Sequence, residues 1–271
     1  MRFSLSALLA VLLLASCAPM TREQAPPPPP AKPQLYSETF GITNPADVRT
    51  LIVLLHGDSA DTPPSYQYSA ARAFAAAVPD SAVVALLRPG YTDGAGHQSP
   101  GERGLATGDN YTADRIAAVA EAILDLRHRY KHARVILAGH SGGAAIAANL
   151  AGMYSGRVDG LLLVSCPCML KEFRAGMKKR MPDTPFDQPV SSFDPMGTVG
   201  GVAPTTRAAI VVGQKDEIAP PKLSRGYAEA LTLRGIATDF RIVPNQGHEI
   251  LEDPETIAAL RQLAQALEKH P

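Results

Sequence analysis

Short apolar runs alternate with helical stretches along the chain from Leu51 onward. Continuous apolar runs rich in β-branched residues are typical of parallel strands that are covered on both faces. TLIVLL (50–55) is such a run, and further strands are expected at SAVVALL (81–87), ARVILAG (133–139), VDGLLLVS (158–165), AAIVVG (208–213) and TDFRIV (238–243).

The stretches between these runs have helical patterns. In residues 111–130, apolar side chains recur at positions 116, 119, 120, 123, 124 and 126 and form one stripe, with Thr112 as a plausible N-cap. Further helices are expected at 66–78, 143–154, 222–235 and 254–269. Repeated strand–helix alternation predicts an α/β fold, a doubly wound and mostly parallel sheet with helices on both faces.

One segment, residues 166–206, interrupts the alternation. It is rich in Pro, Met, Lys and Phe and has no clear period. We expect a short lid-like insertion there, over the carboxyl ends of the strands, where ligands bind in such sheets. Cys166 and Cys168 are only two residues apart and could pair only as a small strained ring, so we expect free, half-buried thiols. No second Cys/His pair lies at ligand spacing, so no metal site is expected.

The N-terminus has the composition of an export signal. Arg2 precedes an apolar run at 5–15, which is shorter than the roughly 20 residues that a bilayer-spanning helix needs. LASC (14–17) resembles the lipobox of bacterial lipoproteins, and this resemblance implies a signal peptide over 1–16 and lipidation of Cys17. An ordinary secretory signal that contains a cysteine is the alternative. Ala18 after the cysteine favours the outer membrane, on its periplasmic face, in a Gram-negative source.

Residues 17–34 are expected to be a lipidated cysteine and a proline-rich tether. Five consecutive prolines favour extended polyproline II, so this segment would hold the domain at 35–271 off the membrane. A proline-rich partner-binding motif is the alternative reading. Lys plus Arg and Asp plus Glu both number 26, so no basic excess indicates nucleic acid as a partner, and membrane contact is expected through the lipid anchor.

Gly139-His140-Ser141-Gly142-Gly143 matches the pattern G-x-S-x-G. An expected strand precedes it and an expected helix follows, as required for a serine exposed on a strained strand-to-helix turn. Side chains at 139 and 143 would collide where the helix returns along the strand. The rival pattern for this stretch, the dinucleotide-binding G-x-G-x-x-G, is not present. Ser141 is therefore the candidate nucleophile.

A serine hydroxyl needs a general base, and the base needs an orienting carboxylate. In hydrolases with this turn, the acid and then the histidine follow the serine in the chain. Two histidines follow Ser141, and His270 lies at the C-terminal tail, so His248, between the last expected strand and helix, is the candidate base. A surface histidine in a turn is the alternative.

Asp216 follows the carboxyl end of the strand at 208–213 and is the candidate acid, with Glu217 as its neighbouring rival. The carboxylates inside the insertion are poorer candidates; they are Asp183, Asp187 and Asp194.

The oxyanion of an acyl-transfer intermediate needs two converging backbone N–H donors. Gly142, directly after the nucleophile, is expected to supply one. His56-Gly57 ends the first strong strand and resembles the HG motif of lipases and esterases, so Asp58 N–H is the expected second donor.

Together, LHGDS (55–59), RPGYTDGAG (88–96), GHSGG, GQKDEIAPP and QGHE resemble the α/β-hydrolase-fold serine hydrolases in order and spacing, over about 36–269. Within these hydrolases the chain resembles the dienelactone-hydrolase-like and prolyl-oligopeptidase-like members. Asp58 departs from the usual HGG loop, Ser141 replaces the cysteine of true dienelactone hydrolases, and only one or two strands fit before Leu51.

The resemblance implies a serine hydrolase without a cofactor that cleaves a small-molecule ester through an acyl-enzyme, by a triad of Ser141, His248 and Asp216. Tyr91 is expected at the pocket wall. A serine peptidase is the nearest alternative, in which the Asp58 carboxylate would bind a substrate amino group. A non-catalytic envelope lipoprotein on the same scaffold is the alternative from a different class.

Overall fold

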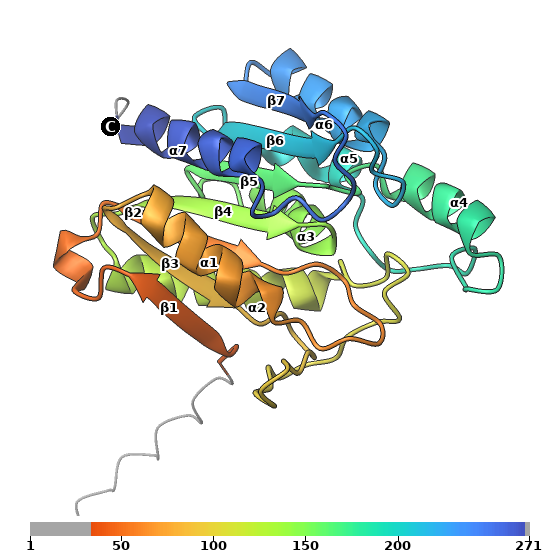
Figure 1. The fold of residues 1–271 in the computed structure, drawn as a ribbon, viewed down its shortest axis with the longest axis horizontal. Helices are drawn as coiled ribbons and strands as arrows, with labels where there is room; N and C mark the ends of the chain where they lie inside the picture. Colours follow the sequence, from red (N-terminus) through yellow and green to blue (C-terminus); the bar gives the residue numbers. More distant parts are fainter. Residues whose placement is uncertain (1–33, 269–271) are drawn as a thin grey trace, which may run out of the picture. The chain divides into compact units, whose positions relative to one another are not determined.

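The computed structural model describes residues 34–268 of the chain. A seven-stranded sheet runs through the centre of the domain in the order β1-β3-β2-β4-β5-β6-β7 (Figure 1). β1 is antiparallel to β3, and every other pair of neighbouring strands is parallel. The predicted doubly wound, mostly parallel sheet is confirmed. The strands are β1 (Ser37–Gly41), β2 (Thr50–Leu55), β3 (Ser81–Leu86), β4 (Arg134–His140), β5 (Gly160–Val164), β6 (Arg207–Gly213) and β7 (Thr238–Val243).

Helices cover both faces of the sheet. The α-helices are α1 (Tyr66–Ala77), α2 (Ala113–Arg129), α3 (Gly142–Met153), α4 (Leu170–Arg180), α5 (Pro195–Thr198), α6 (Pro221–Leu233) and α7 (Pro254–Glu268). Two short 3-10 helices are η1 (Pro45–Asp47) and η2 (Val199–Gly201). Within residues 34–268, no helix combines the length and the apolar character that crossing a membrane would require.

Alternation along the strands divides the core into two layers. Leu51, Val53 and Leu55 of β2 pack with residues of α2, α3 and α6, whereas Ile52 and Leu54 pack with residues of α1 and α7. Since successive side chains of a strand point to opposite faces, a strand covered on both sides must be apolar throughout. This explains why every residue of β2 is buried and why the sequence shows continuous apolar runs.

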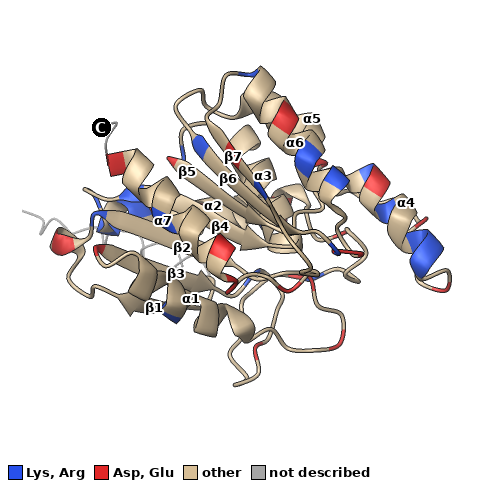
Figure 2. Cartoon of the chain, turned by 45° about the horizontal axis from the view of Figure 1, so that its top comes forward, with Lys and Arg blue, Asp and Glu red and all other residues tan. Residues whose placement is uncertain are grey.

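Residues 166–206 contain a helix that the sequence pattern did not predict. In α4 the buried residues are Leu170, Phe173, Arg174 and Met177, so only three of the four are apolar. Figure 2 shows the many charged positions along this helix, which mask its helical period. The expectation of an irregular insertion is thus corrected for this stretch.

Cys166 and Cys168 form a disulfide, so the expectation of free thiols is wrong. Their Cα atoms lie 5.1 Å apart, within the usual range for disulfides. The chain turns directly after β5, at Ser165 with φ +50°, and a single residue, Pro167, separates the two cysteines. Both are fully buried rather than half-buried. The expected signal peptide, Cys17 and most of the tether lie outside the described residues.

Candidate active site

Ser141 lies between β4 and α3, at the carboxyl end of the sheet. Its backbone angles are φ +51° and ψ −121°, in a region that non-glycine residues rarely adopt. Such strain is expected at a tight strand-to-helix turn that exposes a nucleophile. The expected strand before Ser141 and the expected helix after it are both present.

The glycines beside Ser141 allow β4 and α3 to approach closely. A Cβ atom at Gly139 would overlap the backbone of Gly143 and Ala144. One at Gly143 would overlap the carbonyl oxygens of Leu55 and His56, at and just after the end of β2. The collision predicted for side chains at positions 139 and 143 is therefore observed.

His248 and Asp216 form a hydrogen-bonded pair in the loops after β7 and β6. His248 Nδ1 lies 2.8 Å from Asp216 Oδ2 and 3.0 Å from Oδ1. Asp216 is 3% exposed, and its Oδ1 also accepts from the N–H groups of Ile218 and Ala219 at 2.9 and 2.8 Å. A carboxylate accepts only, so Nδ1 of His248 carries the proton and Nε2 is left as an acceptor. Glu217, the rival acid, is exposed and pairs with Arg180 instead.

Ser141 and His248 line one pocket of about 320 Å³. Within residues 34–268, no hydrogen bond joins Ser141 Oγ to the imidazole. Catalytic hydrogen bonds are often long before substrate binds, so a shared pocket is the relevant relationship here.

Two backbone N–H groups next to Ser141 are available to a ligand. Gly142 is the first residue of α3, so its N–H has no acceptor one turn earlier in the helix. In the described part of the chain, the Asp58 N–H also makes no hydrogen bond, whereas Gly57 N–H donates to Tyr66 Oη at 2.5 Å. A Cβ atom at Gly57 would lie 3.1 Å from Ser141 Cβ, so this loop runs directly beside the serine.

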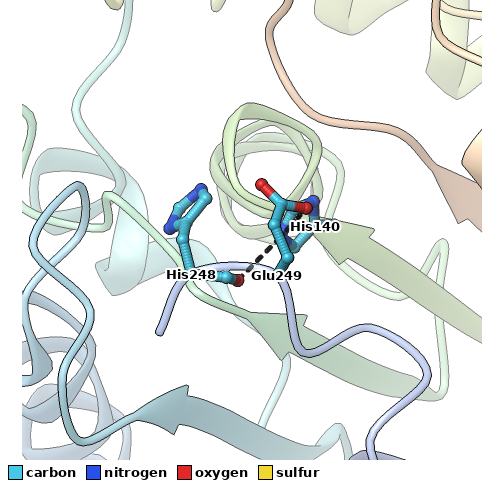
Figure 3. Close-up of side chains that lie close together, drawn as sticks. All are labelled: His140, His248 and Glu249. Atoms are coloured by element: carbon cyan, nitrogen blue, oxygen red, sulfur yellow. Dashed lines mark hydrogen bonds and ion pairs between the residues drawn. The ribbon is translucent and has the colours of Figure 1, made fainter. Parts of the chain in front are cut away.

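His140 connects the loop at Gly57 to the loop at His248. Its Nε2 lies 3.1 Å from the His248 carbonyl oxygen (Figure 3), and its Nδ1 lies 2.9 Å from Tyr66 Oη. Because a carbonyl only accepts, Nε2 carries the proton and Nδ1 accepts from the Tyr66 hydroxyl. Burial, with a smaller contribution from His248, lowers the pKa of His140 to about 4. His140 is therefore neutral at pH 7, and both of its ring nitrogens are already used.

Two groups of side chains within residues 34–268 have the composition of metal ligands. The first is His140, His248 and Glu249, whose side chains are drawn in Figure 3. The second is Glu38, Asp93 and His97, on the side of the domain near β1. His140 has no free lone pair, and the Asp93 carboxylate accepts from Tyr68 Oη, from His97 and from two backbone N–H groups. Hydrogen bonds therefore explain why the side chains of each group lie close together.

A model of the alpha/beta hydrolase family matches residues 52–197, which is more than half of the chain. The chain belongs to the alpha/beta hydrolase family. Among curated protein sequences, no match is found.

Solved structures of esterases and lipases have the same fold as this alpha/beta hydrolase. Esterase PE8 has a TM-score of 0.61 at 14% identity, covering 86% of this chain and 99% of its own. The monoacylglycerol lipase of Paleococcus ferrophilus has a TM-score of 0.57 at 18% identity, covering 88% and 100%. Est1E from Butyrivibrio proteoclasticus, solved with ferulic acid, has a TM-score of 0.62 at 14% identity, covering 87% and 94%.

Tyr91 does not line the pocket of this alpha/beta hydrolase, contrary to the prediction. It is 1% exposed, and its hydroxyl lies 3.4 Å from the Ser59 N–H, behind the loop. The Asp58 carboxylate does line the pocket, but it is bound by Arg88 and by the Tyr111 hydroxyl, both at 2.8 Å. A substrate amino group would have to compete with these two partners.

Several residues of the site were not predicted from the sequence. The apolar wall of the pocket includes Phe173, Met177, Phe186 and Ile218. Phe173 and Phe186 meet edge to face, with ring centroids 6.1 Å apart. An i, i+4 apolar spacing at Phe173 and Met177 is the signal that could have indicated a helix over the pocket.

Proposed function

We propose that the protein is a serine ester hydrolase. The observation that carries this proposal is the buried Asp216–His248 pair, whose histidine shares a pocket with a serine on a strained strand-to-helix turn. Membership of the alpha/beta hydrolase family and the fold of several esterases support it.

In the proposed reaction, Ser141 Oγ attacks the carbonyl carbon of an ester, and His248 Nε2 accepts the hydroxyl proton. The tetrahedral oxyanion receives hydrogen bonds from the N–H groups of Gly142 and Asp58. When the intermediate collapses, the alkoxide leaves with the proton held by His248, and an acyl-enzyme remains. Water, deprotonated by His248, then releases the acid and restores Ser141. Asp216 orients the imidazole and stabilises its charged form.

The pocket favours an uncharged acyl or alcohol group of modest size. Its volume of about 320 Å³ is at the small end of ligand sites. Phe173, Met177, Phe186 and Ile218 supply an apolar surface. The lining contains no lysine or arginine that could bind an anionic group, and its two carboxylates, Asp58 and Glu249, would repel one. Short-chain or single-ring esters are therefore the proposed substrates.

Labelling with a fluorophosphonate tests the nucleophile directly. We expect modification at Ser141 in the wild-type protein and none in Ser141→Ala, with kcat for p-nitrophenyl butyrate lowered by about 10⁴ or more. Ser155→Ala is the matched control, because Ser155 is exposed in the turn at the other end of α3. A wild-type protein that is neither labelled nor active would instead support a non-catalytic scaffold.

Aminoacyl amides separate an esterase from a peptidase. We expect ester hydrolysis to exceed amide hydrolysis, since the Asp58 carboxylate is already bound by Arg88 and Tyr111. Preferential cleavage of amides with a free amino group, lost in Asp58→Asn, would contradict the proposal and favour the peptidase.

We propose further that the enzyme is anchored in the bacterial envelope through Cys17, which lies outside the described residues. In a Gram-negative host, radiolabelled palmitate should be incorporated into the wild-type chain and not into Cys17→Ser. Equal labelling of the two proteins would overturn the anchor, without bearing on the hydrolase.

A further inference from the structure

A buried ion pair lies directly under the loop that carries Asp58. Arg88 Nη2 is 2.8 Å from Asp58 Oδ1, and the two side chains are 1% and 11% exposed. The Tyr111 hydroxyl donates to the other carboxylate oxygen at 2.8 Å. The carboxylate thus has a charged and a neutral partner, supplied from segments far apart in the chain.

This carboxylate lies against the start of α3. A Cβ atom at Gly142 would overlap the Asp58 side chain, so the carboxylate packs on the Cα of the residue that follows Ser141. The N–H of Gly142 is one of the two donors proposed for the oxyanion. An uncompensated negative charge at this place would oppose the negative charge that develops on the substrate, because charges interact strongly where water is excluded.

Arg88 also holds the loop through its backbone and through Nη1. Its N–H donates to His56 Nε2 at 3.0 Å, and Nη1 donates to the His56 carbonyl at 3.1 Å. His56 Nε2 is then an acceptor, so Nδ1 carries the proton and donates to the Gly57 carbonyl at 2.8 Å. Within residues 34–268, Arg88 Nε has no partner, so the side chain's hydrogen bonds all go to this loop.

The protonation states of these groups agree with a fixed, overall neutral cluster. Burial alone would lower the pKa of Arg88, but Asp58, Tyr91 and Tyr111 raise it, and the net direction is upward. Burial, followed by the charge of Asp58, raises the pKa of Tyr111 well above its usual value. Burial, followed by the charge of Arg88, lowers the pKa of His56 well below its usual value.

We propose that Arg88 is a positioning residue for ester hydrolysis, which neutralises the Asp58 carboxylate beside the oxyanion and fixes the loop that presents the Asp58 N–H. This inference rests on the proposed function. It explains how aspartate can stand in a loop position where the usual HGG motif has glycine: the side chain is bound by Arg88 and Tyr111 beneath the loop.

Three variants test the proposal by steady-state kinetics on p-nitrophenyl butyrate, with unfolding in urea to confirm that each protein is folded. Arg88→Met should lower kcat by about 100-fold, the effect of losing one oxyanion donor, with KM changed by no more than about threefold. Arg88→Met/Asp58→Asn removes the uncompensated charge and should recover at least about tenfold of that loss. Arg88→Lys keeps the charge and should remain clearly faster than Arg88→Met.

A double variant as slow as Arg88→Met, or an Arg88→Lys enzyme as slow as Arg88→Met, would overturn the charge-compensation role. If Arg88→Met does not fold, Arg88→Lys decides alone. Its kcat should fall by less than about tenfold, because the positive charge beside Asp58 is kept, and a larger fall with constant KM contradicts the proposal.

Fluorophosphonate labelling of the wild-type enzyme separates this inference from the proposed function. A wild-type protein that is not labelled at Ser141 disproves the serine hydrolase itself. If the wild type is labelled and active, and Arg88→Met has the same kcat, only the proposed role of Arg88 is disproved.

Discussion

His140 and His248 lie with their ring centroids 5.0 Å apart, yet the hydrogen bond between them joins the His140 ring to the His248 backbone carbonyl. Ser165 Oγ donates to the same carbonyl at 2.8 Å. Two donors on one carbonyl hold the loop after β7 in place and leave both imidazole nitrogens of His248 free for Asp216 and for the pocket.

The depressed pKa of His140 predicts a loss of stability in acid. In the unfolded chain this group takes up a proton near pH 6.5, whereas in the folded protein it does so only near pH 4. Between these values the unfolded state binds more protons, so stability falls as the pH falls, by about 3 kcal/mol in total. Urea unfolding from pH 7 to pH 4 should show this extra slope in the wild type and not in His140→Gln. His56 is present in both proteins, so parallel slopes would contradict the assignment to His140.

Replacing Asp216 with asparagine should abolish most of the activity while preserving the fold. The amide can donate to His248 Nδ1 and thereby favour the tautomer in which Nε2 carries the proton and cannot accept one from Ser141. We expect kcat to fall by about 10⁴. Glu217→Gln is the matched control, since Glu217 makes a surface pair with Arg180. Comparable losses in both variants would disprove the choice of acid.

Gly143 and Gly176 both lie in helices but differ in their surroundings. Gly143→Ala places a methyl group on the carbonyl oxygens of β2 and should destabilise the protein by about 1–3 kcal/mol. At Gly176 in α4 nothing lies within 4 Å of the added Cβ, so Gly176→Ala should stabilise by about 0.5–1 kcal/mol. Chemical denaturation measures both changes. Equal changes in the free energy of unfolding would mean that close packing at the turn does not restrict position 143 to glycine.

Phe186 limits the pocket on its apolar side and should control the length of the acyl group. Phe186→Ala should raise the ratio of kcat/KM for octanoate over acetate esters by about tenfold. This ratio does not depend on the fraction of folded enzyme, because both substrates compete for the same active molecules. Phe193→Ala, at a side chain 38% exposed, should leave the ratio unchanged. An unaltered ratio in Phe186→Ala would mean that the acyl group does not bind against Phe186.

Local pattern and chain order were sufficient for much of this molecule. β2 and β7 have the bounds of their predicted strands. β2 is buried on both faces and is therefore a continuous apolar run, whereas β7, a half-buried strand at the edge of the sheet, was predicted from its place in the strand–helix alternation. His248 and Asp216 followed from their place after Ser141 and from loops at strand ends, and the structure joins them by a hydrogen bond. Their catalytic roles stay predictions.

What the sequence did not reveal depends on contacts between distant segments. Arg88 reaches Asp58 because β2 and β3 end side by side, and Tyr111 reaches it from the segment just before α2; no local pattern records either contact. Tyr91 follows the same strand end, yet it faces the underside of the loop. The disulfide between Cys166 and Cys168 closes around a single residue, Pro167, whose backbone conformation residue type alone does not indicate.

The order of the strands also has a consequence for biosynthesis. Asp58, Ser141 and Asp216 follow β2, β4 and β6, whereas His248 follows β7, which pairs only with β6 at the edge of the sheet. A nascent chain that ends before β7 therefore holds Ser141 without His248. Under the proposed mechanism, hydrolysis begins only after the last strand has been synthesised and has docked, so an incomplete chain is inactive.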